Sequence, residues 1–174
     1  SKGDYSLEVE SYYKKIKNRI DYIDGADLIA NEAIEQIILN GRMRSYGLEV
    51  LVRKNSGNFN GWVAYTLSRS EQQTPGRTPT EIGINNGDWY RSAYDKTHNL
   101  AVTGSYKLNK KWSFGANFTL QSGQPVTYPT GKYVFQGVTV PSYNSRNEDR
   151  LPAYHRMDVS ATLTPKKYEN KKFK

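Results

Sequence analysis

Three segments of the chain alternate apolar and polar side chains almost without interruption: Tyr46 to Lys54, Leu100 to Leu108 and Trp112 to Gln121. The pattern is clearest in the third segment, where every second residue is apolar and the residues between are small or polar. A period of two indicates a β-strand with one apolar and one polar face. The segments are roughly nine to twelve residues long, which exceeds the usual soluble strand and suits a tilted strand that crosses a bilayer. We therefore predict an all-β, antiparallel, up-and-down transmembrane β-barrel segment.

The two faces of these strands predict two environments. Charged side chains are tolerated on the polar face because the interior of a barrel holds water. We expect Glu49, Arg150, Arg156 and Asp158 to line that interior and to form cross-strand salt bridges. We expect the apolar face to meet lipid, and its predicted members are Leu48, Val50, Val52, Val63, Tyr65, Leu100, Val102, Phe114, Phe118, Leu120 and Val159.

Aromatic residues are abundant for so polar a chain. The 174 residues include 14 Tyr, 3 Trp and 5 Phe, yet the mean hydropathy is −0.80. A barrel accounts for both facts, because its loops and lumen are polar and its aromatics gather at the two membrane interfaces. The sequence has no run of about eighteen apolar residues, which excludes a transmembrane helix. It has no cysteine, which excludes disulfides and thiolate metal sites or nucleophiles.

The net charge of +8 raises the question of nucleic-acid binding. Much of the excess lies in short turns, such as Lys107, Lys110 and Lys111, and near the end of the chain, from Lys166 to Lys174. A nucleic-acid-binding sheet interleaves its charges with aromatic side chains, whereas here the aromatics alternate with aliphatic residues. We predict that the turn lysines meet solvent and lipid headgroups, and that nucleic acid is not a partner.

The connections between the expected strands alternate long, short, long, short, long. The short turns are 55–57 and 108–110, and we expect a short helix near Asn31 to Leu39 in the first long connection. Outer-membrane barrels have short periplasmic turns and long extracellular loops, so the pattern predicts that arrangement. The expected strands are Tyr5 to Ile16, Arg42 to Lys54, Phe59 to Ser70, Thr97 to Lys107, Trp112 to Gln121 and Tyr154 to Leu163.

Six strands are too few to close a barrel, since about eight is the minimum. An open sheet would leave two edges of unpaired backbone groups in lipid. The chain opens on Ser1-Lys2-Gly3-Asp4 without a signal peptide, and it stops at Lys174 without a final aromatic-ended strand. We therefore expect residues 1–174 to be a partial barrel domain with strands missing on both sides.

Three longer segments resemble the TonB-dependent outer-membrane receptors. Residues 46–68 read YGLEVLVRKNSGNFNGWVAYTLS, with a Gly-x-Glu strand and a Tyr-Thr-x-Ser strand around a turn. Residues 94–129 carry an Asp-x-x-His strand entry and a Ser-Gly-Gln-Pro-x-Thr strand exit. Residues 146–163 carry the segment Arg-Leu-Pro-x-Tyr-His-Arg-x-Asp. The similarity extends in register over nearly the whole chain.

The resemblance implies a location in the bacterial outer membrane and a 22-stranded barrel whose lumen is occluded by an N-terminal plug. It implies that the intact receptor, which is not an enzyme and needs no cofactor, takes up a scarce nutrient such as an iron–siderophore complex, a vitamin, or a glycan or peptide fragment. The partners that it implies are the lipid bilayer, the plug and remaining strands, and the TonB complex through the plug. A surface lipoprotein is a further expected partner.

Candidate chemistry in the chain is sparse. His98 and His155 stand at the starts of two strands, and we expect them to serve as caps and hydrogen-bonding groups, because neither belongs to a catalytic or metal-ligand constellation. Aromatic rings in the loops are the best candidates for ligand contact, since they stack on sugars and on aromatic siderophores. These candidates are Trp89, Tyr90, Tyr128, Tyr133, Phe135 and Tyr143.

A soluble antiparallel β-sheet binding module is the alternative hypothesis. It gives the alternating apolar face a different role, that of packing a protein core. Phe114, Phe118 and Leu120 distinguish the two hypotheses: they are buried against protein in a soluble module and face lipid or detergent in a barrel.

Overall fold

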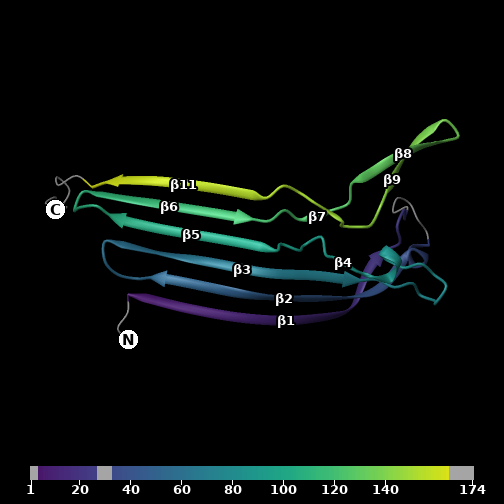
Figure 1. Ribbon diagram of the computed structural model, residues 1–174, viewed down its shortest axis with the longest axis horizontal. Helices are drawn as coiled ribbons and strands as arrows, with labels where there is room; N and C mark the ends of the chain where they lie inside the picture. The colour runs from purple at the N-terminus through teal and green to yellow at the C-terminus, as the bar shows by residue number, and fades with distance from the viewer. Residues whose placement is uncertain (1–3, 27–32, 165–174) are drawn as a thin grey trace, which may run out of the picture.

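The computed structural model of the chain describes residues 4–26 and 33–164 as an antiparallel β-structure (Figure 1). The prediction of an all-β, antiparallel barrel segment is confirmed. No helix in these residues is long and apolar enough to cross a membrane. The strands are β1 Tyr5–Tyr22, β2 Ile38–Lys54, β3 Phe59–Gln73, β4 Trp89–Arg91, β5 His98–Lys107, β6 Trp112–Gln121, β7 Pro125–Val126, β8 Pro129–Phe135, β9 Val138–Tyr143, β10 Asp149–Arg150 and β11 Tyr154–Leu163.

The main sheet has seven strands, in the order β1-β2-β3-β5-β6-β11, with β4 paired to the end of β3. The long strands therefore pair in their order along the chain. Figure 1 shows the tight turns at one end of the sheet and all the long connections at the other. Within the described residues β1 and β11 each pair along one edge, so the sheet is not closed.

The strand register aligns the apolar residues across the sheet. Val50 lies opposite both Val9 and Tyr65, and Tyr65 lies opposite Leu100. Leu100 in turn lies opposite Leu120. A slip of one residue would move a strand's apolar set to the other side, so the pattern specifies this register. We call the resulting side the apolar face, and it includes Leu48, Val50, Val52, Val63, Tyr65, Leu100, Val102, Phe114, Phe118, Leu120 and Val159.

The opposite side of the sheet, here called the polar face, carries the charges expected in the lumen. Arg156 and Asp158 lie there and pair with each other at 2.8 Å within β11. They form no cross-strand bridge to β6, because the residues opposite them are Thr119 and Asn117, which carry no charge. Glu49 lies opposite Glu10, which is a like-charge pair rather than a salt bridge.

The two tight turns have different local causes. Gly57 adopts a φ of +89°, a conformation that glycine reaches without strain. At the second turn, Asn109 Oδ1 accepts hydrogen bonds from the backbone N–H groups of Lys111 and Trp112, at 2.8 and 2.9 Å. This side-chain cap mimics a backbone turn and fixes the entry to β6.

Beyond the apolar face, the first strands run further than expected. β1 continues six residues past Ile16 to Tyr22, with an irregularity between Lys17 and Arg19, and β2 begins at Ile38. The helix expected near residues 31–39 is wrong where the structure describes it: a 3-10 turn covers Ile34–Gln36, and the residues after it join the β1–β2 ladder. Residues 31 and 32 lie outside the described residues.

We predict that one methyl group at Gly61 destabilises the sheet. A Cβ there would lie 2.2 Å from the carbonyl oxygen of Thr103, whereas at its paired neighbour Gly104 the nearest atom would be a ring carbon of Phe59 at 3.4 Å. Gly61→Ala should lower the free energy of unfolding by about 1–3 kcal/mol, and Gly104→Ala by less than about 0.5 kcal/mol. Denaturant unfolding of the receptor that contains this chain, in detergent, measures both. Equal losses would contradict the prediction.

Candidate functional site

A small buried core forms where the long connections meet. Leu39 and Ile84 are 1% exposed and Tyr90 is 7% exposed, with Ile23 packed against them. Ile23 directly follows β1, Leu39 lies in β2, Ile84 begins the 3-10 turn η2 (Ile84–Gly87), and Tyr90 lies in β4. The long-connection end is thus a folded structure held by its own apolar contacts.

Polar bonds fix the ring of Tyr90 in this core. Its hydroxyl accepts a hydrogen bond from Gln72 Nε2 at 2.8 Å and donates to Asp21 Oδ2 at 3.1 Å. The hydroxyl of Thr74 lies 3.2 Å away. Burial raises the pKa of Tyr90, so the phenol stays neutral and keeps its donor.

Arg146 ties the last long connection to the first. Its guanidinium donates to Asp21 Oδ1 at 2.9 Å and to the carbonyl oxygen of Tyr22 at 3.0 Å, and it also pairs with Asp24. Burial alone would lower the pKa of Arg146, but the two carboxylates outweigh it and the net pKa is raised. Asn85 adds two bonds to the Arg146 backbone, at 2.7 and 3.0 Å.

A second buried ion cluster lies between β3 and β5. Asp95 is fully buried and pairs with Arg91 at 3.2 Å and with Arg150. Its other oxygen accepts the backbone N–H of Ser70 at 2.7 Å. Sequence reasoning missed this cluster, because residues 91, 95 and 150 share no motif.

The two histidines occupy the positions expected of them. His98 Nδ1 lies 2.8 Å from the hydroxyl of Tyr65, on the apolar face, and its backbone N–H donates to Ser122 at 2.6 Å. His155 lies at the start of β11, exposed. Among the residues that the structure describes, no three His, Asp or Glu side chains form a group that could hold a metal ion.

The longest connection contains a hairpin of its own. β8 and β9 pair across a turn in which Gln136 and Gly137 both have positive φ, +50° and +80°. Figure 1 shows this hairpin projecting beyond the end of the sheet. The sequence interpretation treated 123–151 as loop and missed it, although the alternation of Tyr133, Phe135, Val138 and Val140 is a hairpin signal.

The six predicted ligand-contact aromatics fall into three settings. Tyr90 is enclosed in the core described above. Trp89, one residue earlier, points to the other side of β4, where the guanidinium of Arg44 lies 4.1 Å from its ring. The other four are 46–61% exposed. Tyr133, Phe135 and Tyr143 lie on the hairpin, and Tyr128 lies just before it.

A polar recess of about 390 Å³ separates two of these connections. Its lining comes from 85–86 and 88–91, from 145–148, and from Arg69 and Glu71 of β3. Its walls offer amide, carboxylate and guanidinium groups that can hydrogen-bond to a polar ligand.

Comparison with known families identifies the chain. Residues 1–173 match the family model described as TonB dependent receptor-like, beta-barrel. The chain belongs to that family. Neither the curated proteins nor the solved structures gave a match. The TonB-dependent receptors are transporters of the bacterial outer membrane rather than enzymes, and they work with a plug and with TonB.

We predict that Tyr90→Phe loosens the loop core of this receptor. The change leaves the ring in place but removes the hydroxyl that bonds to Gln72, Thr74 and Asp21, and Gln72 is itself buried. The expected cost is about 1–3 kcal/mol of local stability. Hydrogen exchange should rise in residues 74–92. Tyr128→Phe, at an exposed ring, is the control and should change nothing; an equal rise in both variants would contradict the prediction.

Proposed function

We propose that this chain forms part of the wall of a larger TonB-dependent barrel that takes up a scarce nutrient. The observation that carries the proposal is the asymmetry of the sheet: tight turns at one end, and at the other a folded set of connections with exposed aromatics. Short turns face the periplasm and long loops face outward in such barrels, so the long connections are the extracellular end.

In the proposed mechanism the extracellular connections, the plug and the strands have different roles. The extracellular end binds the nutrient, an iron–siderophore complex, a vitamin, or a glycan or peptide fragment, through Tyr128 and the β8–β9 hairpin. TonB then acts on a plug in the lumen to let the nutrient pass. The strands in this chain stay rigid, and the Arg146 and Asp95 clusters keep the loops in position. A surface lipoprotein is a further partner in this proposal.

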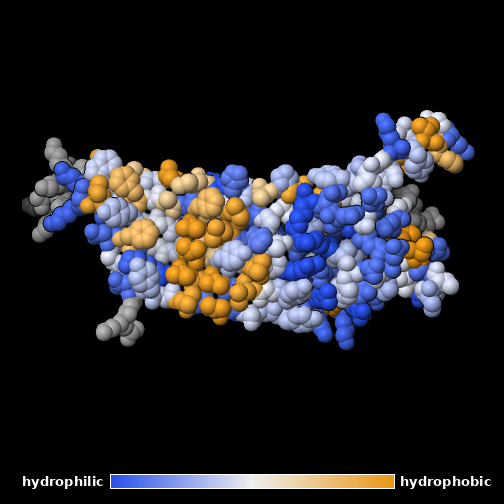
Figure 2. Space-filling model, in the orientation of Figure 1, coloured by the Kyte–Doolittle hydropathy of each residue, from blue (hydrophilic) through white to orange (hydrophobic). Residues whose placement is uncertain are grey.

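The apolar face is the proposed lipid surface. Figure 2 shows hydrophobic residues gathered over the middle of the strands, with hydrophilic residues toward the extracellular end. Leu48 and Leu67 are each 42% exposed and Val63 is 41% exposed. A row of exposed aromatics, Tyr5, Phe59, Tyr106, Trp112 and Phe114, borders the tight-turn end of this face, as at a membrane interface.

A soluble binding module would need to cover the same face. Phe114 is 41% exposed, and Phe118 and Leu120 are half-buried by neighbours in their own sheet. No second layer packs on them in residues 4–26 and 33–164. These observations favour the barrel.

We predict that a charge on the apolar face harms membrane assembly more than a charge on the polar face. Val102 and Thr103 are adjacent in β5 and point to opposite sides. Val102→Lys should cost about 2–4 kcal/mol if it meets the middle of the bilayer, and Thr103→Lys much less. The folded fraction in outer-membrane preparations, from heat-modifiable gel mobility, measures both. A greater loss for Thr103→Lys would reverse the assigned faces.

Nutrient uptake tests the function itself. Cells that carry the intact receptor, or lack it, are given radiolabelled siderophore–iron, vitamin and oligosaccharide or peptide in turn. Uptake of one class should require the receptor and should stop when a protonophore removes the energy source. If none of the classes depends on the receptor, the proposed function fails.

The hairpin variants then test the ligand contacts. We predict that Tyr133→Ala with Phe135→Ala weakens binding of that nutrient by about tenfold, through lost stacking. Val134→Ala, on the other side of β8 and 70% exposed, is the matched control. Binding to whole cells measures the effect at equal receptor levels. An unchanged affinity in the double variant would remove the hairpin from the site.

A further inference from the structure

A row of cationic side chains borders the apolar face at its extracellular end. Lys15 and Lys17 come from β1, Arg42 and Arg44 from β2, and Arg69 from β3; we call these five the basic row. The register places Lys15 opposite Arg44 and Lys17 opposite Arg42, on the same side of the sheet as the apolar residues. In Figure 2 strongly hydrophilic residues adjoin the hydrophobic patch on this side.

The basic row has more positive charge than its neighbours neutralise. Glu71, which is 5% exposed, pairs with Arg44 at 2.7 Å and with Arg69 at 2.6 Å. In the part of the chain that the structure describes, no carboxylate lies within 4.0 Å of Lys15, Lys17 or Arg42. Two arginines therefore share one carboxylate, and three further cations add to the surplus.

The tight-turn end of the same face differs. Its border is aromatic, as described above, and its cation is Lys54, which pairs with Asp4 at 3.6 Å. Lys54 also lies 4.6 Å from the ring centre of Tyr5. Along β1, β2 and β3, the unneutralised positive charge on this face therefore lies at the extracellular end.

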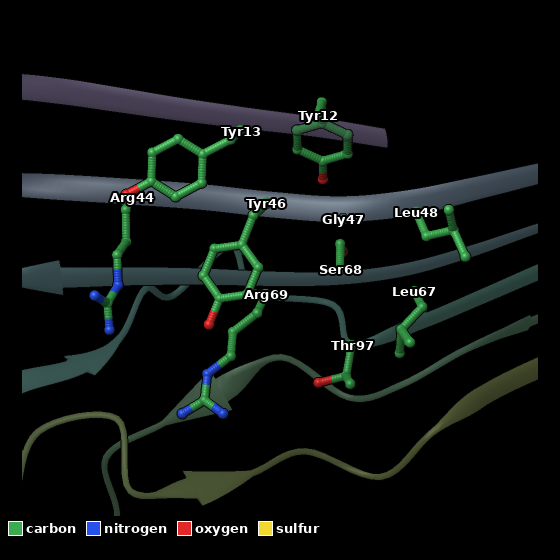
Figure 3. A pocket seen from close by; sticks show the side chains of 10 residues that line it. All are labelled: Tyr12, Tyr13, Arg44, Tyr46, Gly47, Leu48, Leu67, Ser68, Arg69 and Thr97. Atoms are coloured by element: carbon green, nitrogen blue, oxygen red, sulfur yellow. The ribbon is translucent and has the colours of Figure 1, made fainter. Parts of the chain in front are cut away.

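A groove connects the basic row to the apolar face (Figure 3). It has a volume of about 770 Å³ and opens between β1, β2 and β3. Figure 3 shows Arg44 and Arg69 toward one end, Leu48 and Leu67 toward the other, and the ring of Tyr46 between them. The rings of Tyr13 and Tyr46 stack at 6.2 Å and form its wall.

The order of chemical groups along this groove matches the order of groups in a lipid. Leu48 is four positions along β2 from Arg44, a rise of roughly 13 Å. Hydrocarbon suits the leucines, the amphipathic interface suits the tyrosines, and phosphate suits the arginines, whose planar fork binds two phosphate oxygens at once. A nutrient anion in the lumen would meet the other side of the sheet.

We propose that this groove binds a phosphorylated lipid of the extracellular leaflet. The lipid phosphate contacts Arg44 and Arg69, with Lys15 and Arg42 adding long-range attraction, and an acyl chain lies along Leu48 and Leu67. The proposal rests on the lipid-facing assignment made under the proposed function, but not on which nutrient is transported. Its consequence is a receptor whose extracellular end is anchored at a fixed depth.

Native mass spectrometry of the intact receptor in detergent tests the site. The probes are diphosphoryl lipid A, the same lipid with its phosphates removed, and inorganic phosphate. Wild-type receptor should retain the phosphorylated lipid about tenfold more tightly than the dephosphorylated one, as expected for charge-assisted hydrogen bonds. Equal retention of both lipids would overturn the proposal. Competition by inorganic phosphate at the lipid's own concentration would also overturn it, because the site would then be one for free anions.

The variants separate this site from general surface charge. Arg44→Gln, Arg69→Gln and Glu71→Gln are combined, so that no buried carboxylate is left unpaired and the net charge falls by one. Lys111→Gln, at the periplasmic turn, removes the same net charge and is the control. The triple variant should lose the tenfold preference and the control should keep it; a triple variant that keeps it overturns the proposal.

A further variant covers the case in which the triple variant does not fold. Lys15→Gln with Arg42→Gln leaves the Glu71 pairs intact and should weaken lipid retention about threefold, through reduced attraction near the headgroup. Unchanged retention in this variant counts against the proposal. The uptake assay and the lipid assay can fail separately. If no nutrient class depends on the receptor but the receptor still prefers the phosphorylated lipid, the transport function fails and the lipid site stands. If uptake depends on the receptor but the lipid preference is absent, the lipid site fails and the transport function stands.

Discussion

Main-chain hydrogen bonds between neighbouring strands are the constraint on which the rest of this structure depends. In hydrocarbon an unpaired amide costs several kcal/mol, so a membrane strand must pair along its full length on both sides. The ladders from β1 to β11 meet this demand within the sheet, and they fix one register. The two outer edges of the described sheet do not meet it, which agrees with the proposal that this sheet is part of a larger wall.

Two regions of this structure are stabilised in different ways. Over the middle of the strands the apolar side chains stay partly exposed, because a bilayer can take the place of a core. At the end that carries the long connections, the chain builds a conventional core from Leu39, Ile84 and Tyr90. Ion pairs at the fully buried Asp95 and at the partly exposed Arg146 accompany that core. Buried pairs of this kind specify geometry more than they add stability, which suits connections that must hold a binding surface in place.

Sequence reasoning was accurate where a single physical demand governs the residues. The bounds of β6 and β11 agree with the expectation because alternation continues to their ends. It failed beyond the apolar face, where residues 17–22 and 38–41 were assigned to the first long connection although they continue β1 and β2. It also missed the β8–β9 hairpin, because residues 123–151 were taken as one long loop. The bond from Arg146 to Asp21 spans 125 residues, and one sequence carries no signal for such a contact. The ligand contacts and the lipid-facing residues stay predictions.

The pairing of strands in chain order has a consequence for biogenesis. Each long strand finds its partner in the segment made just before or just after it, so the sheet can grow one hairpin at a time and never has to search for a distant strand. The extracellular connections take no part in that growth. They can therefore lengthen, shorten or exchange their residues during evolution while the order of assembly is preserved. Receptors built on this plan can diversify what they recognise without having to solve the folding problem again.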